Sequence, residues 1–176
     1  AGFDFNFFAS PANVPAFAVL GQQGSGVGPT AIAFDARGRL FAATGAGRIL
    51  ILIDTDDDGR ADLVKTFATG IPLPLGLAFR ANGDLFVSSN IAVGAGRILR
   101  LRDTNGDDVA DEQTVILHNL PSNGDHQTNK IRFGPDGLLY IGQGSATDNG
   151  TPSQGRPAEG PLNGAILRVD VDNPQV

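Results

Sequence analysis

The chain has 176 residues, enough for one domain with a substantial core, and 41% of them are hydrophobic, which is typical of a globular protein. The formal net charge of −6, with no basic stripe along the sequence, argues against nucleic acid as a partner. Cysteine is absent, which excludes disulfides and thiolate metal sites, and no apolar run approaches the roughly 20 residues of a membrane-spanning helix.

The chain starts at Ala1 and not at methionine, so we expect that an upstream piece has been removed. A cleaved secretory signal is the natural candidate, and a chain shortened for another reason is the alternative. The 24 glycines and 11 prolines are spread along the sequence and leave no long window that favours a helix. We therefore expect an all-β fold with many turns.

The predicted strands begin with residues 2–8, GFDFNFF, where aromatic side chains alternate. Three similar hairpins follow, and in each one two runs of alternating apolar residues flank a glycine turn that tolerates positive φ. The three hairpins read TAIAFDARGRLFAAT from Thr30, LGLAFRANGDLFVSS from Leu75 and NKIRFGPDGLLYIGQ from Asn129.

Each hairpin is followed by a third strand, and the first two copies end in a fourth, LVKTF and QTVIL. The repeat phenylalanines Phe34, Phe79 and Phe133 are 45 and 54 residues apart. This period and strand count are typical of β-propeller blades. We predict a segment of about three four-stranded blades over approximately residues 28–69, 70–120 and 121–173, with strand 2–8 closing a blade. A sandwich of hairpins is the alternative, but it does not explain the repeated order of elements.

Three blades cannot close a ring, because propellers usually have four to eight. The two end blades are expected to expose apolar faces and open strand edges, which are surfaces for association. We therefore predict half of a six-bladed ring. It would be completed by a second copy in a homodimer, by a second chain, or by a C-terminal half outside this sequence.

Two acidic loops follow the third strands of the first and second blades. They place oxygen side chains at loop positions 1, 3, 5 and 9, a spacing that can wrap Ca²⁺ with a backbone carbonyl at position 7. Neither loop has the glutamate at position 12 of an EF-hand, so we expect strand-flanked calcium loops, with solvated acidic turns as the alternative. The predicted ligands are Asp54, Asp56, Asp58 and Asp62 in the first loop, and Asp103, Asn105, Asp107 and Asp111 in the second.

His126 lies in the predicted connection between the second and third blades. Because successive strands reverse direction, this connection and the two acidic loops should emerge on opposite faces of the propeller. Three further polar segments, Leu20–Gly28, Ser88–Gly96 and Gln143–Gly164, end on the same face as His126 and could line a pocket there. Histidine can exchange a proton near neutral pH, but a lone loop histidine is more often a solvated polar residue.

The segment LPSNGDHQTNKIRFGPDGLLYIGQGS, over residues 120–145, resembles the part of quinoprotein glucose and sorbosone dehydrogenases that carries the catalytic base. The opening GFDFNFFAS, the following PTAIAFDARGRLFAA and the closing GAILRVDVDNP are also similar to that family. Its members are secreted or periplasmic six-bladed propellers that oxidise sugars with pyrroloquinoline quinone (PQQ) and Ca²⁺. The resemblance covers the N-terminal half of such an enzyme.

The resemblance implies that His126 takes the proton from the C1 hydroxyl of a sugar while hydride passes to the quinone. It places Asp125 and Gln143 in the cofactor pocket. Gln143 stands where the family often has a carboxylate that pairs with the histidine, and Asp148 is the alternative partner. The basic residues that grip the quinone and the ligands of its Ca²⁺ belong to the family's second half. No Cys-x-x-Cys-His haem motif occurs, so any cytochrome acceptor would be a separate chain.

Two functions therefore remain open at the level of sequence. The first is a PQQ-dependent, sugar-oxidising dehydrogenase or a part of one, located outside the cytoplasm as the family is. The second is a non-catalytic, calcium-stabilised half-propeller that acts as a binding or assembly module. The His126 segment favours the first, and the replacement of the expected carboxylate by Gln143 favours the second.

Overall fold

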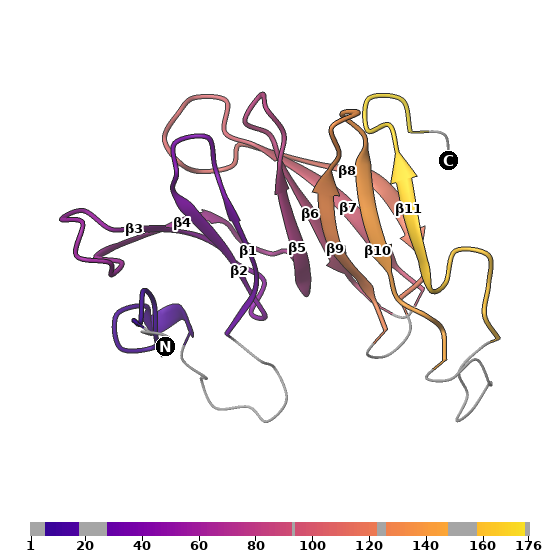
Figure 1. Ribbon diagram of the computed structural model, residues 1–176, viewed down its shortest axis with the longest axis horizontal. Helices are drawn as coiled ribbons and strands as arrows, with labels where there is room; N and C mark the ends of the chain where they lie inside the picture. Colours follow the sequence, from indigo (N-terminus) through magenta and orange to yellow (C-terminus); the bar gives the residue numbers. More distant parts are fainter. Residues whose placement is uncertain (1–5, 18–27, 93, 123–125, 148–157, 175–176) are drawn as a thin grey trace, which may run out of the picture.

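A computed structural model of the chain describes residues 6–17, 28–92, 94–122, 126–147 and 158–174. The described residues form three antiparallel sheets that stand side by side, each built from strands that follow one another in the sequence (Figure 1). Each sheet has the up-and-down strand order of a propeller blade. The prediction of an all-β propeller segment is confirmed.

The first sheet contains β1 (Pro29–Phe34), β2 (Leu40–Thr44), β3 (Ile49–Ile53) and β4 (Leu63–Ala68). The second contains β5 (Pro74–Phe79), β6 (Leu85–Asn90), β7 (Gly96–Arg102) and β8 (Glu112–Leu120). The third contains β9 (Thr128–Phe133), β10 (Leu139–Gln143) and β11 (Ala165–Val169). A short 3₁₀ turn, η1 (Pro15–Phe17), precedes the first sheet.

The three predicted hairpins share one register. Phe34 pairs with Leu40, Phe79 with Leu85 and Phe133 with Leu139, so each turn joins its strands at equivalent residues. The turns need a residue with positive φ, and glycine supplies it each time, for example Gly83 with a φ of 92°. This repetition explains why the hairpins could be read from the sequence.

Two apolar layers hold the sheets together. Between the first and second sheets, Phe41 packs edge to face against Phe79, with ring centroids 4.8 Å apart, and Ile51 and Leu99 are fully buried in the same cluster. Between the second and third sheets, the corresponding ring pair is Phe86 and Phe133, with centroids 5.1 Å apart. Such pairs add about 0.5–1.5 kcal/mol beyond the area they bury.

The two end faces of the segment differ, although both were expected to be open. The outer face of the first sheet is covered by the chain's own N-terminal segment, where Val14 is fully buried and Phe17 packs beside it against Leu50 and Leu52. On the third sheet, Ile166 in β11 keeps 80% of its surface exposed. One of the two predicted association faces is therefore covered, because residues 8–17 fold back over it.

The limits predicted for the three blades remain predictions, as does the closing strand over residues 2–8. Of that segment, residues 2–5 lie outside the described residues, while residues 6–8 belong to none of the three sheets. The fourth strand that was missing from the third blade in the sequence is also absent from the described part of the third sheet.

Candidate functional site

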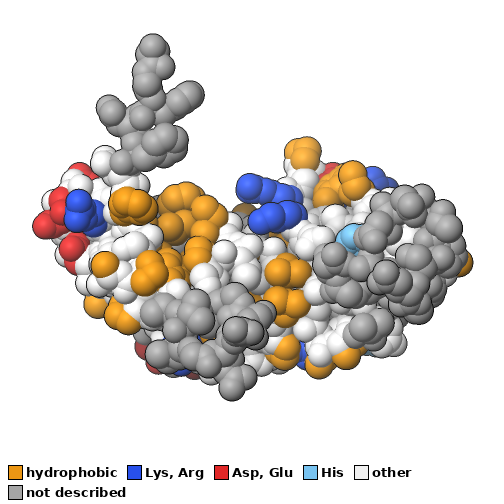
Figure 2. Space-filling view, turned by 90° about the horizontal axis from the view of Figure 1, so that it is seen from below, with side chains coloured by type: hydrophobic (Ala, Val, Ile, Leu, Met, Phe, Trp, Pro, Cys, Tyr) orange, Lys and Arg blue, Asp and Glu red, His pale blue; other side chains and the backbone are white. Residues whose placement is uncertain are grey.

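His126 lies in the connection between β8 and β9, two residues before β9 begins, and it is partly buried. This connection lies at the bottom of Figure 1, whereas the three hairpins and the β7–β8 loop lie at the top and the β3–β4 loop projects to the left. The expected separation of His126 from the acidic loops is thus present. Figure 2 views the His126 end and shows a histidine side chain at its surface.

The backbone around His126 is held tightly against the end of β10. A Cβ added to Gly144 would come within 2.7 Å of the carbonyl carbon of His126, so glycine is required for this approach. The Gly144 N–H donates to the carbonyl of Gln127 at 3.0 Å, and the Gly144 carbonyl accepts from Gly164 at 3.0 Å. The histidine is therefore on a fixed backbone and not at the tip of a loose loop.

The side chain of His126 meets Ser145. The Ser145 Oγ lies 3.3 Å from the His126 Nδ1, and the same hydroxyl lies 2.6 Å from the carbonyl oxygen of Thr147. Close by, the Glu159 carboxylate accepts from the backbone N–H groups of Ala146 and Thr147 at 2.8 and 3.0 Å and from the Thr147 hydroxyl at 2.6 Å. These donors lower the pKa of Glu159, and its electrostatic interaction with His126 acts in the same direction.

Gln143, which was assigned to the cofactor pocket, lies in a buried polar network below this site. Its amide nitrogen donates to the carbonyl of Pro121, and its amide oxygen accepts from the Thr128 hydroxyl at 2.8 Å. Thr128 also exchanges hydrogen bonds with the side chain of Asn90. Gln143 thus ties β10 to the His126 connection, and its contribution to a cofactor pocket stays a prediction. Asp125 and Asp148 lie outside the described residues.

The first acidic loop, residues 54–62, is called here the first aspartate loop. Asp54 accepts from the backbone N–H groups of Asp57 and Gly59, each at 2.8 Å. Carboxylate oxygens of Asp54, Asp56 and Asp58 lie within 4.8 Å of one another, close enough to share one cation. Repulsion from Asp62 and Asp58 raises the pKa of Asp56, which is the electrostatic cost that a bound cation would remove.

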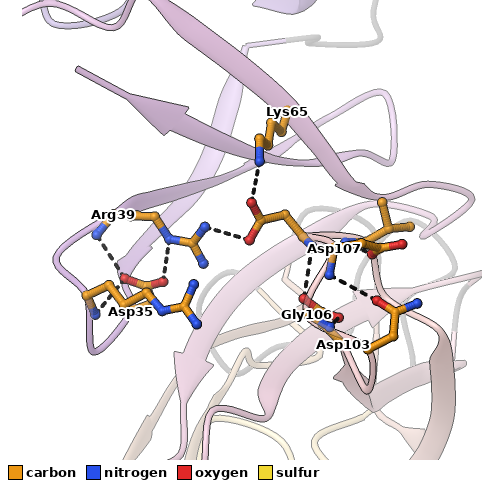
Figure 3. Close-up of polar contacts among 10 residues, drawn as sticks. Asp35, Arg39, Lys65, Asp103, Gly106 and Asp107 are labelled. Carbon is orange, nitrogen blue, oxygen red and sulfur yellow. Dashed lines mark hydrogen bonds and ion pairs between the residues drawn. The ribbon is translucent and has the colours of Figure 1, made fainter. Parts of the chain in front are cut away.

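The second aspartate loop, residues 103–111, has an additional feature that joins two sheets. The Asp108 carboxylate receives the Arg39 guanidinium at 2.6 Å and the Lys65 ammonium group from the first sheet (Figure 3). Lys65 first, and then Arg39, lower the pKa of Asp108 from its ordinary value to about 2. In the same loop, Asp111 accepts from the backbone N–H and the hydroxyl of Thr104, which lower its pKa.

Ser145, Glu159 and the partners of Asp108 were not found by sequence reasoning. The signal for Ser145 is the hairpin register, because β10 pairs Gln143 with Thr128, and two residues further this register places Ser145 opposite His126. An irregularity between Ile141 and Gln143 shifts that register by one residue, so it could not be counted along a regular hairpin. Of the predicted metal ligands, Asp54, Asp56 and Asp58 form the only cluster among the described residues that could hold a metal ion, whereas the Asp62 carboxylate accepts from Thr55. Metal binding by either loop stays a prediction.

Comparison with known proteins gives one family and a group of related structures. A family described as a domain of unknown function (DUF7133) matches residues 26–176. No curated protein matches the chain. Within the described residues, no helix has the length and apolar character needed to cross a bilayer.

Three solved structures show what the fold is similar to. A Thermus thermophilus protein described as a "putative oxidoreductase (glucose dehydrogenase)" is 27% identical, with a TM-score of 0.59 over 82% of this chain and 44% of that one. The PQQ-bound aldose sugar dehydrogenase of Streptomyces coelicolor is 23% identical, with a TM-score of 0.62 over 80% and 44%. The holo PQQ domain of pyranose dehydrogenase from Coprinopsis cinerea is 18% identical, with a TM-score of 0.55 over 66% and 28%.

The resemblance read from the sequence is confirmed by these structures. The chain spans less than half the length of each of the three. It is a propeller segment similar to part of sugar-oxidising dehydrogenases.

Proposed function

The chain belongs to the DUF7133 family, and we propose that it forms the base-carrying half of a PQQ-dependent sugar dehydrogenase. The observation that carries the proposal is the fixed His126 on the loop end of the propeller, with Ser145 on its Nδ1 and a carboxylate, Glu159, in electrostatic contact. The fold similarity to sugar dehydrogenases supports the same chemistry. A secreted or periplasmic location is proposed on the same resemblance.

In this proposal His126 is the general base. Its imidazole accepts the proton of the C1 hydroxyl of an aldose, and the nearby Glu159 carboxylate favours the positive charge that the ring then carries. His126 is partly buried, so the residue keeps some contact with solvent. Electrons would finally pass to an external acceptor such as a cytochrome.

The residues of this chain fit a quinone only in part. PQQ is a polycarboxylate, and a site for it needs several cationic or amide donors. Of the two residues assigned to it, Asp125 lies outside the described residues, and both ends of the Gln143 amide are bonded to Pro121 and Thr128. When bound, PQQ would supply the hydride acceptor, and the groups that grip it would come mainly from the complementary half of the ring.

That complementary half is proposed to dock on the third sheet. The outer face of the first sheet is covered by Val14 and Phe17, so a symmetric contact through that face would have to displace them. Ile166 is exposed on the opposite face, and β11 ends the third sheet in the described part of the chain. A second copy, a second chain and a C-terminal half outside this sequence are all open as partners. Light scattering decides whether the chain assembles with itself, because a folded monomer at all concentrations would contradict a ring made of two copies.

Calcium is proposed to occupy the two aspartate loops in a structural role. Both loops lie away from the β8–β9 connection that carries His126, so their ions would stabilise the blades and take no part in sugar oxidation (Figure 1). The grouping of Asp54, Asp56 and Asp58 supports this role most directly. Dependence of the melting temperature on Ca²⁺ tests it.

The activity test is reconstitution with PQQ and Ca²⁺, followed by dye reduction with an aldose such as glucose. Turnover is expected to fall by at least 100-fold in His126→Ala, since general base catalysis contributes about 10²–10⁴-fold. His118→Ala is the matched control, because His118 is exposed on β8, and it should leave turnover unchanged. Absence of both quinone binding and dye reduction in the assembled protein would overturn the enzyme proposal.

The second candidate is a non-catalytic half-propeller held together by calcium. Its specific support is Gln143, because an amide that is fully engaged in the fold replaces the expected carboxylate. This candidate predicts assembly and a calcium-dependent melting temperature without quinone binding. Equilibrium dialysis of PQQ against the assembled protein separates the two candidates.

A further inference from the structure

The hydroxyl of Ser145 has two neighbours and only one proton to give. Its Oγ lies 2.6 Å from the carbonyl oxygen of Thr147 and 3.3 Å from the Nδ1 of His126. A carbonyl oxygen can only accept, so the short contact with Thr147 uses the hydroxyl proton. In its contact with His126, the Ser145 oxygen must therefore be the acceptor and Nδ1 the donor.

From this proton count we infer that Ser145 holds His126 in the tautomer with its proton on Nδ1. Which ring nitrogen of a neutral histidine carries the proton is set by the hydrogen bond that the other makes. Nε2 then has the lone pair and is the basic nitrogen. Ser145 is thus a positioning residue that selects the basic atom of His126.

The rest of the site keeps Ser145 in this geometry. Ala146 and Thr147 are 0% and 1% exposed, and the Glu159 carboxylate clamps both of their backbone N–H groups. On the other side, Gly144 lies directly against the backbone of His126. The acceptor oxygen is therefore fixed relative to the ring, and rotation of the hydroxyl toward Nδ1 would break its short bond to the Thr147 carbonyl.

The consequence for catalysis rests on the proposed function. In water, neutral imidazole side chains favour the tautomer protonated on Nε2, whose basic atom is Nδ1. In this site the Ser145 contact reverses that preference and directs the basic Nε2 away from the serine. When Nε2 takes a proton, the Ser145 oxygen still accepts from Nδ1, so the contact persists in the imidazolium form.

The direct test is ¹⁵N NMR of the imidazole nitrogens in the intact protein, which needs no substrate and no quinone. At a pH where the rings are neutral, the ¹⁵N chemical shifts of His126 should be those of the Nδ1-protonated tautomer. His118, which is exposed on β8, is the internal reference for the mixture of the two tautomers that a solvated histidine adopts. In Ser145→Ala, His126 should shift toward the His118 pattern. Ser145→Thr keeps a hydroxyl and should restore the wild-type pattern.

A matched control removes a similar serine elsewhere. The Ser89 hydroxyl donates to the carbonyl of Pro72, away from His126 in the sequence, so Ser89→Ala loses a comparable bond and should leave the His126 spectrum unchanged. Wild-type His126 in the Nε2-protonated form would overturn the inference. So would an unchanged His126 tautomer in folded Ser145→Ala.

If dye reduction is observed, Ser145→Ala should lower kcat about tenfold with little change in KM, the effect of one ordinary hydrogen bond. Ser145→Thr should recover most of that loss. An Nδ1-protonated His126 in a protein without turnover would leave the tautomer established and sink only the enzyme proposal. An Nε2-protonated His126 in an active protein would overturn the tautomer inference and leave the enzyme proposal intact.

Discussion

The two aspartate loops have the same backbone framework but different ways of balancing their charge. In both, the first aspartate accepts from the N–H groups of positions 4 and 6, and the last aspartate accepts from the backbone and hydroxyl of the threonine at position 2. This nine-residue unit is therefore a repeated structural element of the blades. Its fold does not depend on which carboxylates surround it.

The glycine stands at a different position in each loop, although the backbone hydrogen bonds are the same. Positions 4 and 6 have positive φ in both loops, and they are Asp57 and Gly59 in the first loop and Gly106 and Asp108 in the second. Aspartate tolerates this conformation better than most residues because its short polar side chain bonds locally. Each loop therefore needs only one glycine, and the other left-handed position is free to carry a carboxylate.

The position of that carboxylate decides how each loop is neutralised. In the second loop Asp108 reaches Arg39 and Lys65 of the neighbouring sheet, and position 3 is the neutral Asn105, whose amide donates to Asp111 at 3.1 Å. In the first loop position 3 is Asp56, and its raised pKa reports repulsion. We infer that the first loop depends more on a cation from solution, whereas the second carries part of its counter-charge in the protein.

The two loops also differ in the segment to which each one is hydrogen-bonded. The N–H of Ala110 in the second loop donates to the carbonyl of Phe67 in β4, whereas the equivalent Ala61 in the first loop donates to the carbonyl of Phe8. Phe8 thus takes the place that the outer strand of a preceding blade holds elsewhere. The N-terminal segment therefore substitutes, at this contact, for a blade that precedes the first.

The largest expected effect is that of calcium on the first loop. Chelation of Ca²⁺ should lower the melting temperature of the wild type by about 5–10 °C. This is the stabilisation that a bound ligand provides when its free concentration is roughly 100 times its Kd. Asp56→Asn should remove more of this stabilisation than Asp107→Asn, since a charged ligand is lost from the more repulsive loop. Calorimetry with and without Ca²⁺ measures both. Equal melting temperatures in the two conditions would mean plain acidic turns.

The next effect is that of the inter-sheet pairs on the second loop. Asp108→Asn should destabilise the protein by about 1–2 kcal/mol, because two charge-assisted hydrogen bonds are weakened. The effect stays small because the Lys65 side chain is 41% exposed and therefore screened by solvent. Asp57→Asn, at the other aspartate with positive φ, is the control and should change the unfolding free energy by less than about 0.5 kcal/mol in urea. Equal losses would show that Asp108 gains nothing from its partners.

Sequence reasoning reached the features that repeat and missed those that depend on tertiary contact. The hairpins and the acidic loops recur with the same spacing, so turn chemistry and alternation predict them. The pairing of Asp108 with Arg39 joins residues 69 positions apart, and nothing in a single sequence reports such a contact. Ser145 was missed for a local reason, the shift in register between Ile141 and Gln143, which moves Ser145 opposite His126.

The pH dependence of the second loop should follow Asp108. Its folded pKa, about 2, lies below its ordinary value of 3.8, so the stabilisation is complete above about pH 4 and is lost as the pH falls toward 2. After allowance for solvent screening, the loss is about 1 kcal/mol. The difference in unfolding free energy between wild type and Asp108→Asn should shrink over that range in acid titrations monitored by urea unfolding. A constant difference from about pH 6 to about pH 2 would contradict the pairing.

The smallest effect concerns the glycine of the first loop. A Cβ at Gly59 would meet no atom within 4 Å, so a substitution there is limited by its φ of +83° and not by space. Gly59→Asn should cost about 0.5 kcal/mol, because the strain of a left-handed residue exceeds the entropy gained in the unfolded chain by only that much. Gly59→Asp should cost more than Gly59→Asn at low salt without Ca²⁺, since it adds a carboxylate to the repulsive loop, and the gap should close at high salt. Thermal unfolding of the pair at two salt concentrations measures this difference. If Gly59→Asp were the more stable variant at low salt, position 6 of the first loop would already have a cationic partner, and the contrast with Asp108 would be lost.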